Sequence, residues 1–185
     1  MDKRGSVLII ESEILLQKEK LNLAEHVFAK PENIVFSNVV RNICEKNTCR
    51  MYGTTWACPP AVGTVEQCKA RCNEYENVFI FTTMYHLKDM FDVKEWKDDR
   101  IMHERVTDKV AKIFQSKYPV ALVLSTEGCT VCNTCTYPDK PCRFPERMHP
   151  ATESYGILVT ESAKVCGIKY NNGPETLTYF SMIFY

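Results

Sequence analysis

The stretch from Gly128 to Pro145 reads GCTVCNTCTYPDKPCRFP. Its first three cysteines are separated by two residues each, and the fourth follows after six more; they are Cys129, Cys132, Cys135 and Cys142. Bacterial ferredoxins hold iron–sulfur clusters with the run C-x2-C-x2-C-x3-C-P. Here the last gap is longer, but the closely spaced triple is the same. Because such a short loop supplies thiolates from several directions around one point, we predict a metal site here, and iron–sulfur in preference to zinc.

Zinc and disulfide bonds are the alternatives for these four cysteines. Structural zinc sites typically use two close pairs of ligands separated by a longer loop, whereas three evenly spaced cysteines favour a cubane cluster. Cysteines only two residues apart are poorly placed for a disulfide, because the geometry of that bond is narrow. The spacing therefore favours metal ligands over S–S bridges.

Composition limits the kind of protein further. A chain of 185 residues that is 45% hydrophobic can bury one ordinary core, so we expect a single domain over 1–185. The formal net charge is zero, which argues against a nucleic-acid partner. No apolar run approaches the roughly 18 residues of a membrane span, and Glu11 and Glu13 interrupt the apolar start, unlike a signal peptide. We expect a cytoplasmic protein whose ten cysteines serve as metal ligands.

A second cysteine-rich loop covers 44–72, where the gaps between cysteines are four, eight, nine and three residues. Gly53, Pro59 and Pro60 predict an irregular backbone, and irregular backbone with several thiols is typical of a metal site. A helix that Thr64 can cap would place Cys68 and Cys72 on one face. We predict a second set of four thiolate ligands, which consists of Cys44, Cys49, Cys58 and Cys68.

Three alternatives stay open for this second loop. Only the region of Cys49 and Cys58 ligates, or these cysteines complete the site of the 128–145 loop, or the two loops exchange one ligand as in two-cluster ferredoxins. Cys72 is a reserve ligand, since a buried cysteine otherwise acts as a small hydrophobe. Cys166 lies in an apolar helix, and we expect it in the core.

Three other residues accompany the cysteines. Arg143 follows Cys142 directly, where a guanidinium can donate to a cluster sulfide or a bound anion; a surface or fold-stabilising role is the alternative. Trp56 is expected to shield a cluster from water and so to tune its potential. His149 comes soon after the 128–145 loop and is either a ligand or proton donor, or a surface residue.

The remaining pattern predicts an α/β or α+β fold, with a single mixed sheet, flanking helices and the two cysteine-rich loops near one edge. Residues 1–30 show weak helical spacing from Ile14 to Phe28, with a strand at Val7 to Ile10 as the alternative. Elsewhere we predict strands over 78–85, 120–125 and 176–185, and helices over 37–43, 64–77, 94–117 and 161–166. The strand over 120–125 runs directly into the 128–145 loop.

Two motifs together point to a known family. They are C-x4-C-x2-YG-x2-W-x-CPP-x2-G from Cys44 to Gly63, and GC-x2-C-x2-C-x6-CR-x-P-E from Gly128 to Glu146. The pair resembles a family of predicted metal-binding proteins of unknown function that is common in anaerobic bacteria and archaea. The resemblance extends from about Ile34 onward. It implies metal binding, and iron–sulfur in particular, but it supplies no reaction.

These observations favour an electron-transfer protein that holds one or two [4Fe–4S] clusters and works with a redox partner protein. A second copy of the chain is a further candidate partner. A Gly-rich nucleotide fingerprint and a P-loop are both missing from the sequence. The competing hypotheses are an enzyme whose cluster leaves one iron open to a small substrate and a structural zinc protein.

Overall fold

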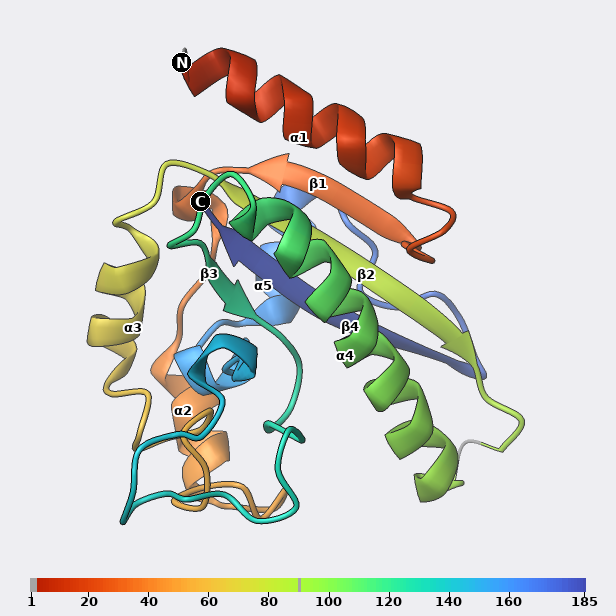
Figure 1. Ribbon diagram of the computed structural model, residues 1–185. Coiled ribbons are helices and arrows are strands. Elements are labelled where there is room, and N and C mark those ends of the chain that lie inside the picture. The colour runs from red at the N-terminus through yellow and green to blue at the C-terminus, as the bar shows by residue number, and fades with distance from the viewer. Residues whose placement is uncertain (1–2, 90) are drawn as a thin grey trace.

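The computed structural model describes residues 3–89 and 91–185 (Figure 1). Its α-helices and strands follow one another in this order: α1 (Lys3–Gln17), β1 (Glu25–Ala29), α2 (Asn38–Glu45), α3 (Val65–Cys72), β2 (Val78–His86), α4 (Val93–Gln115), β3 (Leu122–Leu124), α5 (Val159–Cys166) and β4 (Thr176–Phe184). Among the helices of these two ranges, none combines the length and the apolar character that crossing a membrane requires.

The strands form one four-stranded sheet in the order β1-β2-β4-β3. Every neighbouring pair of these strands is antiparallel, and Ile80 in β2 lies between Val27 in β1 and Met182 in β4. Outside the named strands, Ser125 and Ala151 form a parallel bridge, and Phe36 and Ile157 form an antiparallel one. The expected single sheet with flanking helices is confirmed, in its α+β form, but its strands are all antiparallel, so it is not the mixed sheet that was predicted.

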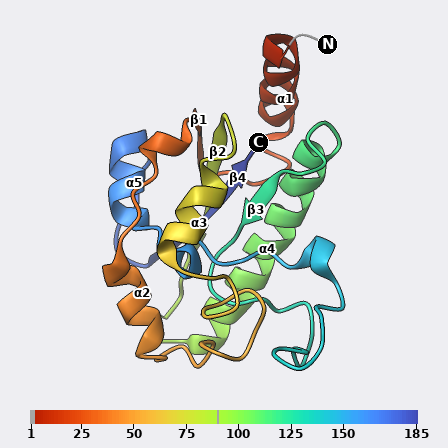
Figure 2. The ribbon, with the colours of Figure 1, turned by 90° about the vertical axis from the view of Figure 1, so that its left-hand side faces the viewer.

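Alternation along β2 builds a core on each face of the sheet. Phe79 and Phe81 pack with residues of α1 and α4, whereas Val78 and Ile80 pack with residues of α3 and α5. Successive side chains of a strand point to opposite faces, and this strand is apolar at both sets of positions, so it is buried on both sides. Figure 2 shows α1 and α4 on one side of the sheet and α5 on the other.

A fully buried histidine joins α4 to the sheet. His103 makes hydrogen bonds of 2.8 Å with the hydroxyls of Thr83 in β2 and Ser181 in β4, through its two ring nitrogens. The hydroxyl of Thr107, one turn further along α4, is also 2.8 Å from that of Ser181. Burial lowers the pKa of His103 to about 3, so the ring is neutral at physiological pH.

The first thirty residues differ most from the sequence-based prediction. Val7 to Ile10 belongs to α1 rather than to a strand, and the helix ends at Gln17. Val27 and Phe28 lie instead in β1, where they pair with β2. Pairing with a neighbouring strand overrides weak local helical spacing. The helix that begins after its Thr64 cap is also shorter than predicted, because it ends at Cys72.

Candidate metal centre

The two cysteine-rich loops lie side by side at one end of the molecule, far from α1 (Figures 1 and 2). The indole nitrogen of Trp56 donates to the carbonyl of Lys140 over 3.1 Å, and its ring meets Tyr137 edge-on at 4.9 Å between centroids. Gly128 is packed so closely against Met51 that a Cβ at this position would collide with the methionine side chain. Segments some 70 residues or more apart in sequence therefore form one structural unit.

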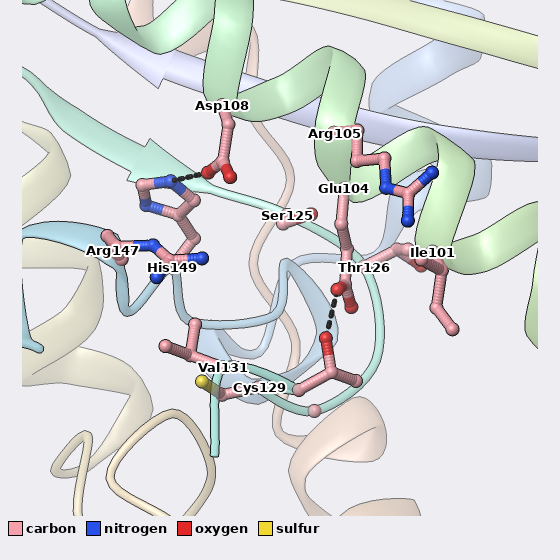
Figure 3. A pocket seen from close by; sticks show the side chains of 12 residues that line it. Ile101, Glu104, Arg105, Asp108, Ser125, Thr126, Cys129, Val131, Arg147 and His149 are labelled. Atoms are coloured by element: carbon pink, nitrogen blue, oxygen red, sulfur yellow. Dashed lines mark hydrogen bonds and ion pairs between the residues drawn. The ribbon is translucent and has the colours of Figure 1, made fainter.

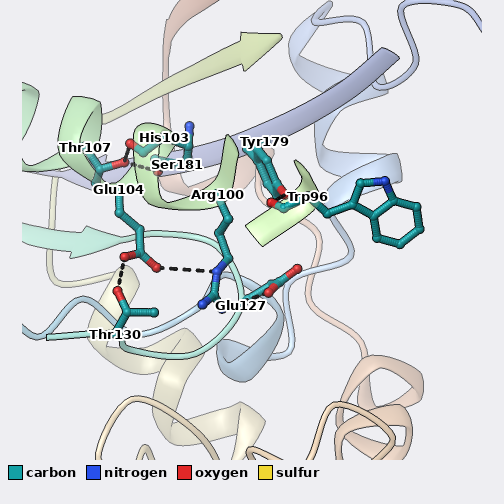
Figure 4. A network of polar contacts seen from close by, with 9 residues as sticks. All are labelled: Trp96, Arg100, His103, Glu104, Thr107, Glu127, Thr130, Tyr179 and Ser181. Atoms are coloured by element: carbon teal, nitrogen blue, oxygen red, sulfur yellow. Dashed lines mark hydrogen bonds and ion pairs between the residues drawn. The ribbon is translucent and has the colours of Figure 1, made fainter. Parts of the chain in front are cut away.

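The 128–145 loop is tied to α4 at its start (Figure 4). Arg100 donates to the carboxylate of Glu127 over 2.8 Å, and the Thr130 hydroxyl donates to the carboxylate of Glu104. Glu127 has a φ of 50°, a left-handed conformation that is uncommon outside glycine. The backbone thus turns sharply just after β3 and carries Cys129 back toward the other loop.

All four predicted ligands of this loop line one cavity of about 20 Å³. Trp56 and Arg143 line the same cavity, and their influence on a bound metal stays a prediction. Arg143 also donates to the carbonyl of Thr134 and so closes the loop on itself. The four thiols are half-buried: Cys129, Cys132, Cys135 and Cys142.

The thiols surround the cavity without meeting at metal-bonding distance. Among residues 3–89 and 91–185, no three cysteine, histidine or carboxylate side chains converge closely enough to hold an ion. All ten cysteines are free thiols. A set of four thiols around one cavity fits a thiolate-bound metal in its donor chemistry.

The 44–72 loop contributes Thr55 and Trp56 to the lining of this cavity, and none of its cysteines. The pKa of Cys58 is raised to about 11, mainly by burial and to a smaller extent by the charges of Cys49, Cys44 and Cys129. A hydrogen bond with Thr55 acts in the opposite direction. Cys44, Cys49 and Cys129 are thus close enough to Cys58 for their charges to act on it. α2 ends at Glu45 and so delivers Cys44 to this place, as the sequence predicted.

The fourth predicted ligand of this loop, Cys68, lies elsewhere. Cys68 and Cys72 are both 0% exposed and belong to the core beneath the sheet. The thiol of Cys68 accepts from Arg71 over 3.2 Å and donates to the carbonyl of Val62 over 3.4 Å. The structure therefore does not gather Cys68 with the other three, and its role as a ligand stays a prediction. Cys166 packs against the same core, as expected.

Glu153 is a polar residue near these thiols that the sequence analysis did not single out. Its Oε2 atom is buried and has no hydrogen-bond partner among the described residues. Burial raises the pKa of this carboxyl group, and its charge in turn contributes to raising the pKa of Cys44. The sulfur of Cys44 lies 3.9 Å from the Glu153 carbonyl. Sequence spacing gave no signal here, since 109 residues separate the two.

A larger cavity adjoins the first one (Figure 3). Cys129 and Val131 line both cavities and so form the wall between them. His149 is half-buried here, with its Nε2 atom 3.0 Å from a carboxylate oxygen of Asp108 on α4. This hydrogen bond lowers the pKa of Asp108. His149 is thus fixed by a partner that only the packing of α4 against the loop reveals.

The fold and this geometry define a cysteine-rich α+β protein with a thiol-lined site between two loops. The chain belongs to the family described as predicted metal-binding protein (DUF2284), whose model matches residues 28–185. This match confirms the resemblance that the two motifs indicated. No curated protein and no solved structure matches the chain.

Proposed function

We propose that the 128–145 loop holds an iron–sulfur cluster through its four thiols and that the protein transfers electrons to a redox partner. One observation carries the proposal: cysteines with ferredoxin-like spacing line a single cavity together with Trp56 and Arg143. A bound cluster would supply one-electron chemistry. Trp56 would cover it, and the exposed Arg143 would donate to its sulfides or to an approaching acidic partner.

The position of the site also favours electron transfer. The four loop thiols are only half-buried, and the loops form one end of the molecule (Figure 2). A partner protein can therefore approach the centre closely without rearranging the two cores. A cofactor buried between the sheet and α4 would not allow such an approach.

We further propose that Cys44, Cys49 and Cys58 hold a second centre beside the first. The closeness of Cys44, Cys49 and Cys129 to Cys58 supports this. Glu153 is the added candidate for the remaining position, because its buried carboxylate oxygen has no hydrogen-bond partner among the described residues. Cys68 would have to leave the core to take that position.

Anaerobic purification followed by iron and sulfide counts and an absorbance spectrum tests this function. We expect iron and sulfide in equal amounts, with about four of each for one cubane or about eight for two, and sulfide-to-iron charge-transfer bands. Zinc is the second candidate, because a cavity of about 20 Å³ has room for a single ion. A colourless protein with stoichiometric zinc and no sulfide would contradict the iron–sulfur proposal.

A further inference from the structure

The larger cavity has a volume of about 180 Å³ and lies between α4, the end of β3 and the segment that carries His149 (Figure 3). Cavities of about 150 Å³ take up molecules as large as benzene, so this one suits a ligand of roughly six to ten non-hydrogen atoms. Because Cys129 forms part of its wall, a ligand here would lie next to the thiol cavity.

The carboxylates and the arginines around this cavity differ in how they are partnered. Its two carboxylates already have partners: Glu104 accepts from Thr130 and lies 3.9 Å from Arg100, and Asp108 is held by His149. Its two arginines, Arg105 and Arg147, have no carboxylate within ion-pair distance in the part of the chain that the structure describes; Arg105 donates only to the Met102 sulfur, and Arg147 lies over the Phe144 ring. Both guanidinium groups are exposed, and their remaining N–H donors are therefore available to a ligand in the cavity.

The two arginines stand on opposite sides of the cavity. Figure 3 shows Arg105 extending from α4 on one side, and Arg147 beside His149 on the other. Guanidinium groups bind carboxylates and other oxyanions through paired hydrogen bonds. Two such groups facing one cavity favour a ligand with an anionic group at each end.

Ser125 supplies an independent sign of a ligand. It is 4% exposed, it lines the cavity, and its hydroxyl oxygen has no hydrogen-bond partner among the described residues. Its backbone is fixed by hydrogen bonds with Pro150 and Thr152, so the residue cannot withdraw from the site. A buried hydroxyl without a partner is costly, and rotation about its single side-chain bond would present it to a bound acceptor.

We propose that this cavity binds a small oxyanion ligand, with Arg105 and Arg147 at its two ends and Ser125 donating from the interior. A short dicarboxylate has the matching charge and size, and an inorganic oxyanion shares the same recognition chemistry. Binding itself does not require a metal. That the bound anion is the substrate or regulator of the thiol centre rests on the proposed function.

Calorimetric titration of the full chain at low ionic strength tests the site, with sodium succinate, sodium acetate and inorganic phosphate as probes. We expect succinate to bind at least tenfold more tightly than acetate, since it can engage both arginines. Tighter binding of phosphate than of succinate would support the oxyanion site and assign it to an inorganic ligand. Binding of none of the three at millimolar concentration would overturn the proposal.

Substitutions of the cavity residues test whether the anion binds in this cavity. Arg105→Gln and Arg147→Gln should each weaken succinate binding about tenfold, whereas Lys109→Gln, on an exposed position of the same helix, should leave it unchanged. Ser125→Ala should weaken binding about fivefold without lowering the melting temperature of the ligand-free protein. Equal losses in Lys109→Gln would show nonspecific attraction and refute the site. Iron counts on Arg105→Gln and Arg147→Gln separate anion binding from metal binding, because these variants should lose anion affinity and keep their full metal content.

Discussion

The two cysteine-rich loops differ in how completely their spacing predicts their structure. In the 128–145 loop, the structure gathers all four cysteines around one cavity. In the 44–72 loop, Cys44 and Cys49 lie close to Cys58, as does Cys129 of that cavity, whereas Cys68 and Cys72 are buried in the core. The difference lies in the local backbone. Close spacing without helix brings thiols together, but cysteines four apart on an amphipathic helix share its buried face.

The largest expected effect comes from breaking the first loop. Cys132→Ala should abolish metal binding at the cavity of that loop and destabilise the loop, because this irregular segment depends on its ligands. Iron and sulfide counts should fall by one full centre. Cys166→Ala is the matched control. Cys166 packs against the core, so this variant should keep the full metal content of the protein. Full metal content in Cys132→Ala would remove Cys132 from the ligand set.

The buried His103 makes the stability of the core depend on pH. The folded pKa of His103 is about 3, against 6.5 for the free side chain, so only the unfolded state takes up a proton between these values. Stability contributed by the neutral ring is complete above pH 6.5, and we expect it to fall by up to about 1.4 kcal/mol per pH unit below that.

Denaturant titrations of metal-free protein at several pH values measure this slope. His103→Gln should flatten it, although the variant should be less stable at pH 7. His86→Gln removes an exposed histidine and should retain the wild-type slope. An unchanged slope in His103→Gln would show that other groups govern the acid response.

A comparison of Cys68 with Cys49 sharpens the contrast between the loops. Cys68→Ala should keep its metal and lose about 1–2 kcal/mol of stability, through the cavity that a deleted core atom leaves. Cys49→Ala, at an exposed position, should do the opposite: lose metal and leave the metal-free protein as stable as before. If Cys68→Ala loses a full metal centre instead, the four-thiolate set predicted from the sequence is correct.

The smallest effect concerns the contact between the loops. Trp56→Phe removes the hydrogen bond to the Lys140 carbonyl, and we expect a loss of about 1 kcal/mol and faster proteolysis of both loops. Trp96→Phe is the control, because no hydrogen bond of the Trp96 indole is found in the described structure. Identical proteolysis in the two variants would indicate that Trp56 does not hold the loops together.

The sequence predicted those parts of the fold that depend on local pattern. The strand from Val78, the helix from Val93 and the strand from Thr176 were all expected, because long apolar runs and strong periodicity identify such elements. β1 was missed, since its five residues become a strand only by pairing with β2. Local spacing cannot reveal that pairing.

The candidate site, like the fold, was predicted only where local spacing carries the information. Spacing identified the four cysteines of the 128–145 loop and placed Trp56 and Arg143 with them. It did not identify Glu153, Glu104 or Asp108, because their proximity to the thiols arises from the packing of separate segments. The spacing of Glu104 and Asp108 puts both on one face of α4, but nothing local indicates that the 128–145 loop covers this face.

The position of β4 in the sheet has a consequence for biosynthesis. β4 follows the thiol loop in sequence, yet it lies between β2 and β3. On the ribosome, where synthesis runs from the N-terminus, the cysteines of both loops emerge while β3 still has no strand beside it. The thiols thus exist for a time in a nascent chain that cannot yet hold them in place. They are least protected from oxidation and from binding a wrong metal before Thr176–Phe184 has been made.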